Sequence, residues 1–330
     1  MEKPVSISVN NLSRKFGTHL AVKNISFEIQ AGEIVGFLGP NGAGKSTTMR
    51  ILGGLLSAHT GSATVCGLSV AEDSLAVKRK IGFMQENNPL PDELRVNEYL
   101  RLRAELKEVP QEDISTEVRR VMDLCDLFRT ARRKIIGTLS KGFKQRVGIA
   151  DALIGAPEVI IFDEPTIGLD PHQIQGIRKL IDSLRGKHTV LISSHVLSEI
   201  EKICDRVIIL NNGHLVAMGT KAELKEAFIT EHKLSVDLTG EVNALLEHWR
   251  SLKLDFEVLE EQNKGNDSYE LILKLPAETL DIEPFINTVN PLNRLENCRI
   301  QGIHIIEPDL EAIFLAATTR SWDEVRLKEV

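Results

Sequence analysis

A glycine-rich segment between an apolar run and a helix-forming run constrains the fold more than any other part of this sequence. It reads Gly39-Pro-Asn-Gly-Ala-Gly-Lys45-Ser46-Thr47 and satisfies the pattern G-x-x-x-x-G-K-[ST]. Glycines let successive backbone amides approach phosphate oxygens, and the start of a following helix adds a favourable dipole. Because residues 33–38 read as a buried strand and residues 46–55 as a helix, the segment predicts a phosphate-binding loop rather than an ordinary glycine turn. We expect the ligand to contact its whole length: Gly39, Pro40, Asn41, Gly42, Ala43, Gly44, Lys45, Ser46 and Thr47.

Polar side chains in two places fit the chemistry of a nucleoside triphosphate such as ATP. Lys45 can reach the β- and γ-phosphates, and the Ser46 hydroxyl suits Mg²⁺. Residues 159–162 form an apolar run that ends in Asp163 and Glu164. Adjacent side chains at a strand end point to different sides, so Asp163 can hold Mg²⁺ through water while Glu164 polarises an attacking water. An apolar strand ending in acids is common and says little alone. Its presence in the same sequence as the phosphate-binding loop is what predicts a nucleotide site.

Strand and helix patterns alternate along residues 1–220, which predicts an α/β fold. Short apolar runs from residue 5 to residue 29 read as a small antiparallel β region that leads into the buried strand before the loop. Further strand patterns occur at residues 159–162, 189–193 and 207–210. Amphipathic helical segments separate these strands, so we expect a mixed sheet covered on both faces. Residues from about 90 to 145 carry charged helical segments and hardly any strand signal, which predicts a mainly helical insert.

A second pattern begins after residue 220 and predicts a smaller α+β domain over residues 221–330. Strand alternation is expected at residues 234–238, 256–259, 269–275 and 300–306, and helical faces at residues 242–252 and 282–289. The order strand, helix, strand, strand, helix, strand is ferredoxin-like. Leu310, Ile313, Phe314 and Ala317 then recur at helical spacing. Nothing in this part matches a nucleotide or metal motif, so we favour a packing or dimer-supporting extension over a regulatory role.

Length and charge limit the classes of protein to consider. The 330 residues suffice for about two domains. The net charge of −7 argues against a chain that coats nucleic acid, and residues 221–330 hold 12 basic and 22 acidic residues. No run approaches the ~20 apolar residues that a membrane helix needs. The first residues lack the basic start and apolar core of a signal peptide, so we expect a cytoplasmic chain.

Further motifs, in a fixed order, give the sequence its resemblance to a known family. The run Leu139-Ser-Lys-Gly-Phe-Lys-Gln-Arg146 resembles the signature loop of ATP-binding subunits of ABC transporters. Gln85 matches that family's Q-loop glutamine, Asp170 in Gly168-Leu-Asp170 its D-loop, and His195 its switch histidine. Phe16 stands where the family has the aromatic residue of its A-loop.

The resemblance implies an ATPase that works as a head-to-tail dimer closing on two ATP molecules. Lys45, Glu164, His195 and Gln85 would be catalytic, with Glu164 as the base and His195 holding the γ-phosphate and the attacking water. Ser46, Gln85 and Asp163 would hold Mg²⁺. Ser140 and Gly142 would contact the γ-phosphate bound by the partner subunit, and Asp170 would organise the partner's site. Phe16 would stack on adenine.

Each of these residues also has a plainer interpretation when taken alone. Gln85 reads as an exposed glutamine and His195 as a capping or core histidine. Ser140 with Gly142 reads as a helix cap, and Phe16 as a core phenylalanine in a half-buried strand. The joint order and spacing of the motifs favour the functional interpretation.

Two departures from the family pattern narrow the resemblance. Lys141 and Phe143 stand where the commonest signature has glycine and glutamine. This variant resembles the ATPases of ABC-2-type exporters, including the gliding-motility and drug-resistance branches, and Phe143 leaves ribose contacts by the fifth signature residue open. The alternative is a soluble ABC ATPase that acts on nucleic acid or ribosomes. Only 55 positions separate Gln85 from Ser140, which leaves no room for the long coiled coils of chromosome ATPases, and translation-factor relatives carry two such domains.

The resemblance also implies partners. The chain would form a homodimer or pair with a paralogous ATPase subunit, and it would lie on the inner face of the cell membrane through transmembrane permease subunits. No nucleic-acid partner is expected. Permease contacts are expected beside Gln85, at Asn87, Asn88, Pro89 and Leu90, and the alternative is a solvated loop.

Overall fold

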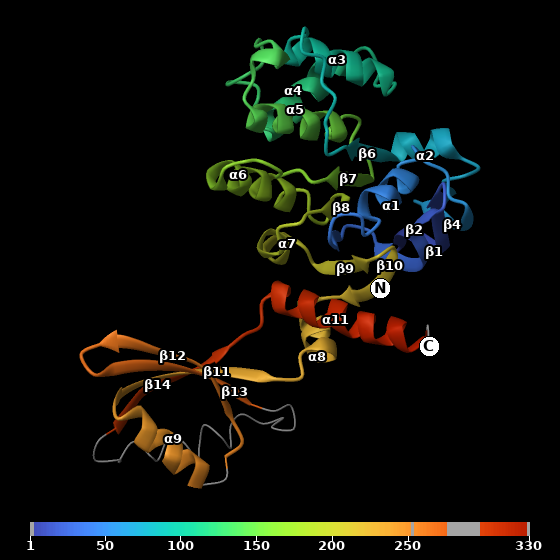
Figure 1. Ribbon diagram of the computed structural model, residues 1–330. Helices are drawn as coiled ribbons and strands as arrows, with labels where there is room; N and C mark the ends of the chain where they lie inside the picture. Colours follow the sequence, from blue (N-terminus) through green and yellow to red (C-terminus); the bar gives the residue numbers. More distant parts are fainter. Residues whose placement is uncertain (1–2, 252–253, 276–297, 329–330) are drawn as a thin grey trace. The chain divides into compact units, whose positions relative to one another are not determined.

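The computed structural model describes residues 3–251, 254–275 and 298–328, and the chain divides into two compact units (Figure 1). The first unit runs to Lys221 and includes the chain again from Ala317, and the second comprises Ala222–Ala316. The predicted boundary at residue 220 lies beside the end of the first unit. The sequence predicts a second domain over residues 221–330, and the contacts group the chain from Ala317 onward with the first unit.

A six-stranded sheet forms the centre of the first unit. Its strands, in order, are β10 (His214–Gly219), β9 (Arg206–Asn211), β3 (Ile34–Leu38), β8 (Thr189–Ser193), β7 (Val159–Asp163) and β6 (Ile81–Met84). All neighbours are parallel except β10 and β9. Every residue of β3, β7 and β8 is buried, as expected for parallel strands covered on both faces. The parallel register brings the carboxyl ends of β3, β6, β7 and β8 to one edge of the sheet.

A second, antiparallel sheet packs on one face of the central sheet. It contains β1 (Val5–Phe16), β2 (His19–Gln30), β4 (Thr60–Val65) and β5 (Leu68–Ser69), in the order β2-β1-β4-β5. Its inward residues share one apolar cluster with α1 (Lys45–Leu52) and with alternate residues of β3, β7, β8 and β9. The rings of Phe27 and Phe37 meet edge to face there, with centroids 5.5 Å apart. This cluster holds α1 against the sheet through Met49, Ile51 and Leu52.

Helices complete the first unit. They are α2 (Ser74–Lys80), α3 (Val96–Leu106), α4 (Ile114–Leu124), the short 3₁₀ helix at Ile136–Thr138, α5 (Lys141–Leu153), α6 (Pro171–Asp182) and α7 (Leu197–Ile203). In Figure 1, α6 and α7 lie on the side of the central sheet opposite α1. Gly36 of β3 permits the close approach of α7, because a methyl group at Gly36 would lie 2.4 Å from the side chain of Ile200. Between β6 and β7 the described structure is helical, in agreement with the predicted insert.

The second unit begins within α8 (Lys221–Phe228) and is built on a four-stranded antiparallel sheet. Its strands are β11 (His232–Gly240), β12 (Glu257–Gly265), β13 (Ser268–Leu275) and β14 (Cys298–Ile306), in the order β12-β13-β11-β14. Helix α9 (Val242–Ser251) carries the fully buried Trp249 into the core. The connection through α9 leaves β13 between β11 and β12, the strand order of a ferredoxin-like fold. The second predicted helix, at residues 282–289, lies outside the described residues, and α11 (Leu310–Lys328) follows β14.

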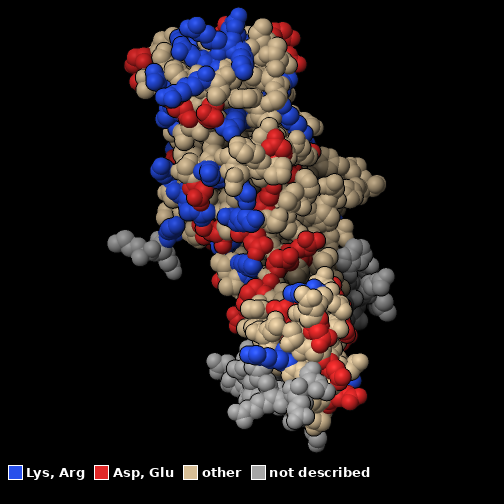
Figure 2. Space-filling model, turned by 90° about the vertical axis from the view of Figure 1, so that its left-hand side faces the viewer, with Lys and Arg blue, Asp and Glu red and all other residues tan. Residues whose placement is uncertain are grey.

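The surface charge follows the asymmetry seen in the sequence. Figure 2 shows Lys and Arg side chains gathered over the helical insert, at the top of the view, and mostly Asp and Glu among the charged groups of the second unit. Across the described ranges, from residue 3 to residue 328 with their two gaps, no helix combines the length and apolar character that a membrane crossing needs.

Candidate functional site

The glycine-rich segment connects β3 to α1 as a tight loop. Gly42 and Gly44 have positive φ values of 83° and 102°, and Gly44 caps α1. A methyl group on Gly44 would lie 2.6 Å from the carbonyl oxygen of Ala21 in β2, so both the backbone angle and the space require glycine. The loop therefore curves around the first amides of α1, which is the geometry that receives an anion.

Lys45 lies at the first position of α1 and its side chain folds back into the loop. The Nζ atom donates to the carbonyl oxygens of Gly39 at 2.6 Å and Pro40 at 3.2 Å. The side chain is 7% exposed, and this burial lowers the pKa of Lys45, although the nearby carboxylates of Glu164, Asp163 and Glu86 oppose the shift. The loop carbonyls thus hold the ammonium group close to three carboxylates.

Asp163 ends β7 and connects this strand to the loop. Its Oδ1 atom accepts a hydrogen bond from the Ser46 hydroxyl at 3.1 Å and another from the Ser193 hydroxyl at 2.7 Å. Its Oδ2 atom is buried and has no hydrogen-bond partner among the described residues. A fully buried carboxylate oxygen without a donor is costly, and a hydrated cation would satisfy it. The pair Ser46 and Asp163 therefore fits Mg²⁺.

Glu164 follows Asp163 and points to the other side, toward His195. Glu164 Oε2 and His195 Nδ1 are 2.8 Å apart, and the amide of Glu164 donates to Ser193 Oγ at 2.8 Å. Glu164 is 6% exposed and has a φ of 53°, an uncommon value for a residue other than glycine. The turn holds the carboxylate in a fixed orientation at the end of β7, where it can accept a proton from a water molecule.

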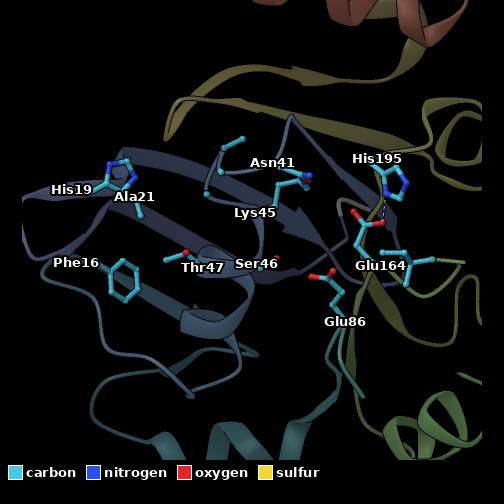
Figure 3. Close-up of a pocket in the computed structure, with 14 residues that line it drawn as sticks. Phe16, His19, Ala21, Asn41, Lys45, Ser46, Thr47, Glu86, Glu164 and His195 are labelled. Atoms are coloured by element: carbon cyan, nitrogen blue, oxygen red, sulfur yellow. Dashed lines mark hydrogen bonds and ion pairs between the residues drawn. The ribbon is translucent and has the colours of Figure 1, made fainter. Parts of the chain in front are cut away.

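The loop from Asn41 to Thr47 lines one cavity of about 710 Å³ together with Glu164 and His195 (Figure 3), whereas Gly39, Pro40 and Asp163 do not form part of its wall. Its wall consists of Phe16, His19, Ala21, Asn41, Gly42, Ala43, Gly44, Lys45, Ser46, Thr47, Glu86, Glu164, Ile167 and His195. Phe16 lies at one end of the cavity, and His195 and Glu164 lie at the other. The adenine ring and the γ-phosphate of a bound ATP would therefore occupy opposite ends. Phe16 is 47% exposed, and the Arg14 guanidinium lies 4.9 Å from the centre of its ring. The alternative of a core phenylalanine is therefore wrong.

Several predicted residues lie outside this cavity wall. Gln85 follows β6 and is half-buried, but it does not line the cavity, whereas its neighbour Glu86 does. Ser140, Gly142 and Asp170 do not line it either, and their role in a partner's site stays a prediction.

Those three residues form the starts of two helices. Ser140 caps α5 and its hydroxyl accepts from the amide of Phe143 at 3.5 Å. Asp170 caps α6, and its carboxylate accepts from the amide of Gln173 at 2.9 Å. The plainer interpretation of Ser140 as a helix cap is thus correct as far as it goes, and it does not exclude a contact across a dimer.

The loop after Gln85 combines exposed and packed residues. Asn87 and Pro89 are exposed and Leu90 is half-buried. Asn88 is also half-buried, and its Nδ2 donates to the carbonyl oxygen of Lys144 in α5 at 3.3 Å. The loop is therefore fastened to α5 rather than wholly solvated.

Sequence reasoning missed four residues of the site. Ser193 ends β8 and pairs with Asp163 in the parallel register. Glu86 lies two residues beyond Met84, the end of β6, at the same edge of the sheet. The rule that the carboxyl ends of parallel strands meet at one edge was the available signal for both. His19 and Ile167 line the cavity without a motif of their own.

Known proteins share both the sequence and the fold of this chain. A family model described as ABC transporter matches residues 22–167. The linearmycin resistance ATP-binding protein LnrL of Bacillus subtilis is 30% identical over 316 residues, which cover 96% of this chain and 99% of that protein. The Nod factor export ATP-binding protein I of Rhizobium leguminosarum bv. viciae is 36% identical over 225 residues, 68% of this chain and 72% of that protein. ABC transporter A family member 1 of Dictyostelium discoideum is much longer, and the chain spans 25% of it.

Solved structures agree with these sequence matches. A dimeric bacterial ABC transporter cassette has a TM-score of 0.60 and 28% identity, covering 65% of this chain and 98% of that one. The same cassette in a post-hydrolysis state, bound to ADP and Pi, has a TM-score of 0.59. The predicted fold class, a P-loop ABC ATPase domain with a mixed sheet, an antiparallel β region and a helical subdomain, is confirmed.

Proposed function

The chain belongs to the family of ABC transporter ATP-binding proteins, and from this premise we propose that it is the ATP-hydrolysing subunit of an ABC-2-type membrane exporter. One observation carries the proposal. A phosphate-binding loop, the carboxylates of Glu86 and Glu164, and His195 line a cavity large enough for a nucleotide. The similarity to a drug-resistance ATP-binding protein over nearly the whole chain, including the second unit, supports the exporter branch.

ATP is proposed to lie with its phosphates in the loop and its base at Phe16. Residues 41–47 line the cavity, and the backbone amides of such a loop suit the phosphate oxygens, while Lys45 would exchange its carbonyl partners for the β- and γ-phosphates. The exposed ring of Phe16 can stack on adenine.

Ser46 and Asp163 are proposed to hold Mg²⁺, together with Gln85. When bound, the ion neutralises charge on the β- and γ-phosphates. Ser46 contributes its hydroxyl, and Asp163 contributes the buried Oδ2 atom that lacks a partner among the described residues. Gln85 follows Met84, the last residue of β6, which pairs with Phe162, the residue before Asp163.

Glu164 is proposed as the base that takes a proton from the attacking water. His195 Nδ1 lies 2.8 Å from its carboxylate, which orients both side chains toward the γ-phosphate end of the cavity. His195 is half exposed, so its ring can also reach the phosphate. A base of this kind contributes roughly 10²–10⁴-fold to a rate.

A closed dimer is proposed to complete each site. Ser140 and Gly142 would present the first amides of α5 to the γ-phosphate held by the partner, and Asp170 would organise the partner's loop. ATP bridges such a dimer better than ADP does, so hydrolysis reopens it and converts chemical energy into motion.

A groove in the first unit is proposed as the place where the permease docks, on the inner face of the membrane. The groove has a volume of about 410 Å³, and Leu55, Leu75 and Leu106 line it while remaining 51%, 75% and 65% exposed. Lys78 and Arg79 also line it, so a short partner helix with apolar and acidic residues would fit. The fastened loop at Asn87, Asn88, Pro89 and Leu90 is proposed as a second contact.

Recovery of the tagged chain from detergent-solubilised membranes of its own host tests the proposal. We expect a multi-span membrane protein to come with the wild-type chain. Leu75→Glu should lower its recovery about tenfold or more, because burying a leucine contributes about 1.5–3 kcal/mol and 1.4 kcal/mol is tenfold. Leu102→Glu is the matched control, since Leu102 is 43% exposed on α3 and does not line the groove. Recovery of ribosomes or DNA-bound proteins with no membrane subunit would overturn the exporter proposal.

A further inference from the structure

Lys141, the first departure from the family signature, reaches across to the D-loop of its own chain. It occupies the first position of α5, between Ser140 and Gly142, and its side chain lies over Gly168. A methyl group on Gly168 would come within 2.2 Å of Lys141 Nζ and 3.1 Å of its Cε. Gly168 also has a φ of 69°. A side chain at position 168 would displace the end of the lysine, and the backbone angle there also favours glycine.

This contact belongs to a seam between the starts of α5 and α6. A methyl group on Gly142 would lie 2.6 Å from the side-chain oxygen of Gln173, and one on Gly176 would lie 2.8 Å from the Arg146 guanidinium. The amide of Gln173 is the donor to the Asp170 carboxylate. The signature loop and the D-loop thus pack against each other within one chain.

The D-loop is also tied to the cavity of the same chain. The amide of Ile167 donates to the carbonyl oxygen of Glu164 at 3.3 Å, and the Ile167 side chain lines the cavity. Gly168, under Lys141, is the next residue. A continuous path of contacts therefore runs from the proposed base to the first turn of α5.

The charge of Lys141 makes its position unusual. A cation near a helix N-terminus is disfavoured by the helix dipole. Within the part of the chain that the structure describes, Lys141 forms no ion pair that would offset this cost. Its position is therefore not explained by stabilisation of α5, and the contact with Gly168 is what it provides.

We propose that Lys141 is a positioning residue that fastens the signature loop to the D-loop, so that the two segments this chain presents to its dimer partner move together. A change at Glu164 and Ile167 in one cavity would then shift Ser140 and Gly142 at the partner's cavity. The inference rests on the proposed dimeric ATPase and adds to it a route by which one ATP site senses the other.

The test measures ATPase cooperativity in the full chain. With two coupled sites, the wild type should show a Hill coefficient above 1, with about 2 as the limit. Lys141→Ala should bring the coefficient to about 1, while binding of a fluorescent ATP analogue to the monomer stays unchanged, because Lys141 does not line the chain's own cavity. Lys141→Met should retain the wild-type coefficient, since its side chain still covers Gly168. If Lys141→Met behaves like Lys141→Ala, packing on Gly168 is not the cause and the proposal is overturned.

A double-mutant cycle examines the contact itself. Gly168→Ala should reduce cooperativity in the wild-type chain, because the methyl group displaces the end of Lys141 in addition to straining the backbone at a φ of 69°. The same change should cause a smaller further loss in the Lys141→Ala background, where the space is free. Strictly additive losses would show that the two residues are not coupled and would contradict the proposal.

Two controls separate this inference from its premise. Lys179→Ala removes an exposed lysine of α6 that does not line the cavity and should leave the coefficient unchanged. A wild type that hydrolyses ATP without forming a dimer would overturn the proposed dimer. A cooperative wild-type dimer whose Lys141→Ala variant keeps full cooperativity would overturn the positioning role alone.

Discussion

Replacing Asp163 by asparagine tests the proposed magnesium site, because asparagine keeps the size of the side chain and removes its charge. The Oδ1 atom accepts hydrogen bonds from the hydroxyls of Ser46 and Ser193, and an amide oxygen can accept both. The Oδ2 atom is buried without a partner among the described residues, and the substitution replaces it by an NH₂ group that cannot bind a cation. The variant should therefore fold and lose mainly its affinity for Mg²⁺.

The expected effect follows from linkage between binding and unfolding. A ligand present at 100 times its dissociation constant stabilises the folded state by ~2.7 kcal/mol. One kcal/mol shifts the unfolding midpoint of a domain of about 150–250 residues by ~2–4 °C. With ATP present, saturating Mg²⁺ should therefore raise the midpoint of the wild-type first unit by about 5–11 °C. The same addition to Asp163→Asn should raise it by less than about 2 °C, because a neutral amide is a weak ligand for this cation.

Differential scanning calorimetry at fixed ATP, with and without Mg²⁺, measures both shifts. Asp182→Asn is the matched control, because Asp182 is an exposed residue of α6 whose surface ion pair with Arg185 contributes little. An equal Mg²⁺-dependent shift in Asp163→Asn and wild type would refute the reasoning, since another group would then hold the ion.

Two further substitutions test the adenine end of the cavity and the core of the second unit. Phe16→Ala should weaken ATP binding about tenfold through loss of stacking, with little change in kcat, and Phe16→Tyr should restore it; titration with a fluorescent analogue measures this, and equal affinity of all three chains would exclude the stacking role. Trp249→Ala removes a fully buried ring that meets Phe256 edge to face at 5.7 Å and should cost about 3–5 kcal/mol. Calorimetry should show a transition of the second unit lowered by about 12 °C or more, and an unchanged thermogram would contradict the assigned core.

The sequence predicted the parts of the fold that local pattern controls. The strands expected at residues 159–162, 189–193 and 207–210 occur at Val159–Asp163, Thr189–Ser193 and Arg206–Asn211. Each is an apolar run between turn residues, so the residues of the run themselves determine the length and the burial of the strand. The expected strand at 256–259 is longer in the structure, because Glu257–Gly265 pairs with β13 although its exposed residues show little alternation.

Parts of the site that depend on register could not be read in the same way. Ser193 bridges Asp163 and the amide of Glu164, yet it is 30 residues from Asp163 in sequence and belongs to no motif. Glu86 lies in the cavity wall because β6 pairs with β7. The sequence does not reveal this strand pairing, since 78 positions separate Glu86 from Glu164. The packing of Lys141 on Gly168 likewise arises from the meeting of two loops that are distant in sequence.

The mass in solution of the Glu164→Gln variant, measured in the presence of ATP and Mg²⁺, tests the central claim most directly. Glutamine keeps the shape of the side chain beside His195 but cannot take a proton from water, so ATP should bind and persist. Size-exclusion chromatography with light scattering should give twice the 36.7 kDa of one chain for this variant, and 36.7 kDa once Lys45→Ala is added. A Glu164→Gln chain that stays at the mass of one subunit, or that hydrolyses ATP at the wild-type rate, would contradict the account.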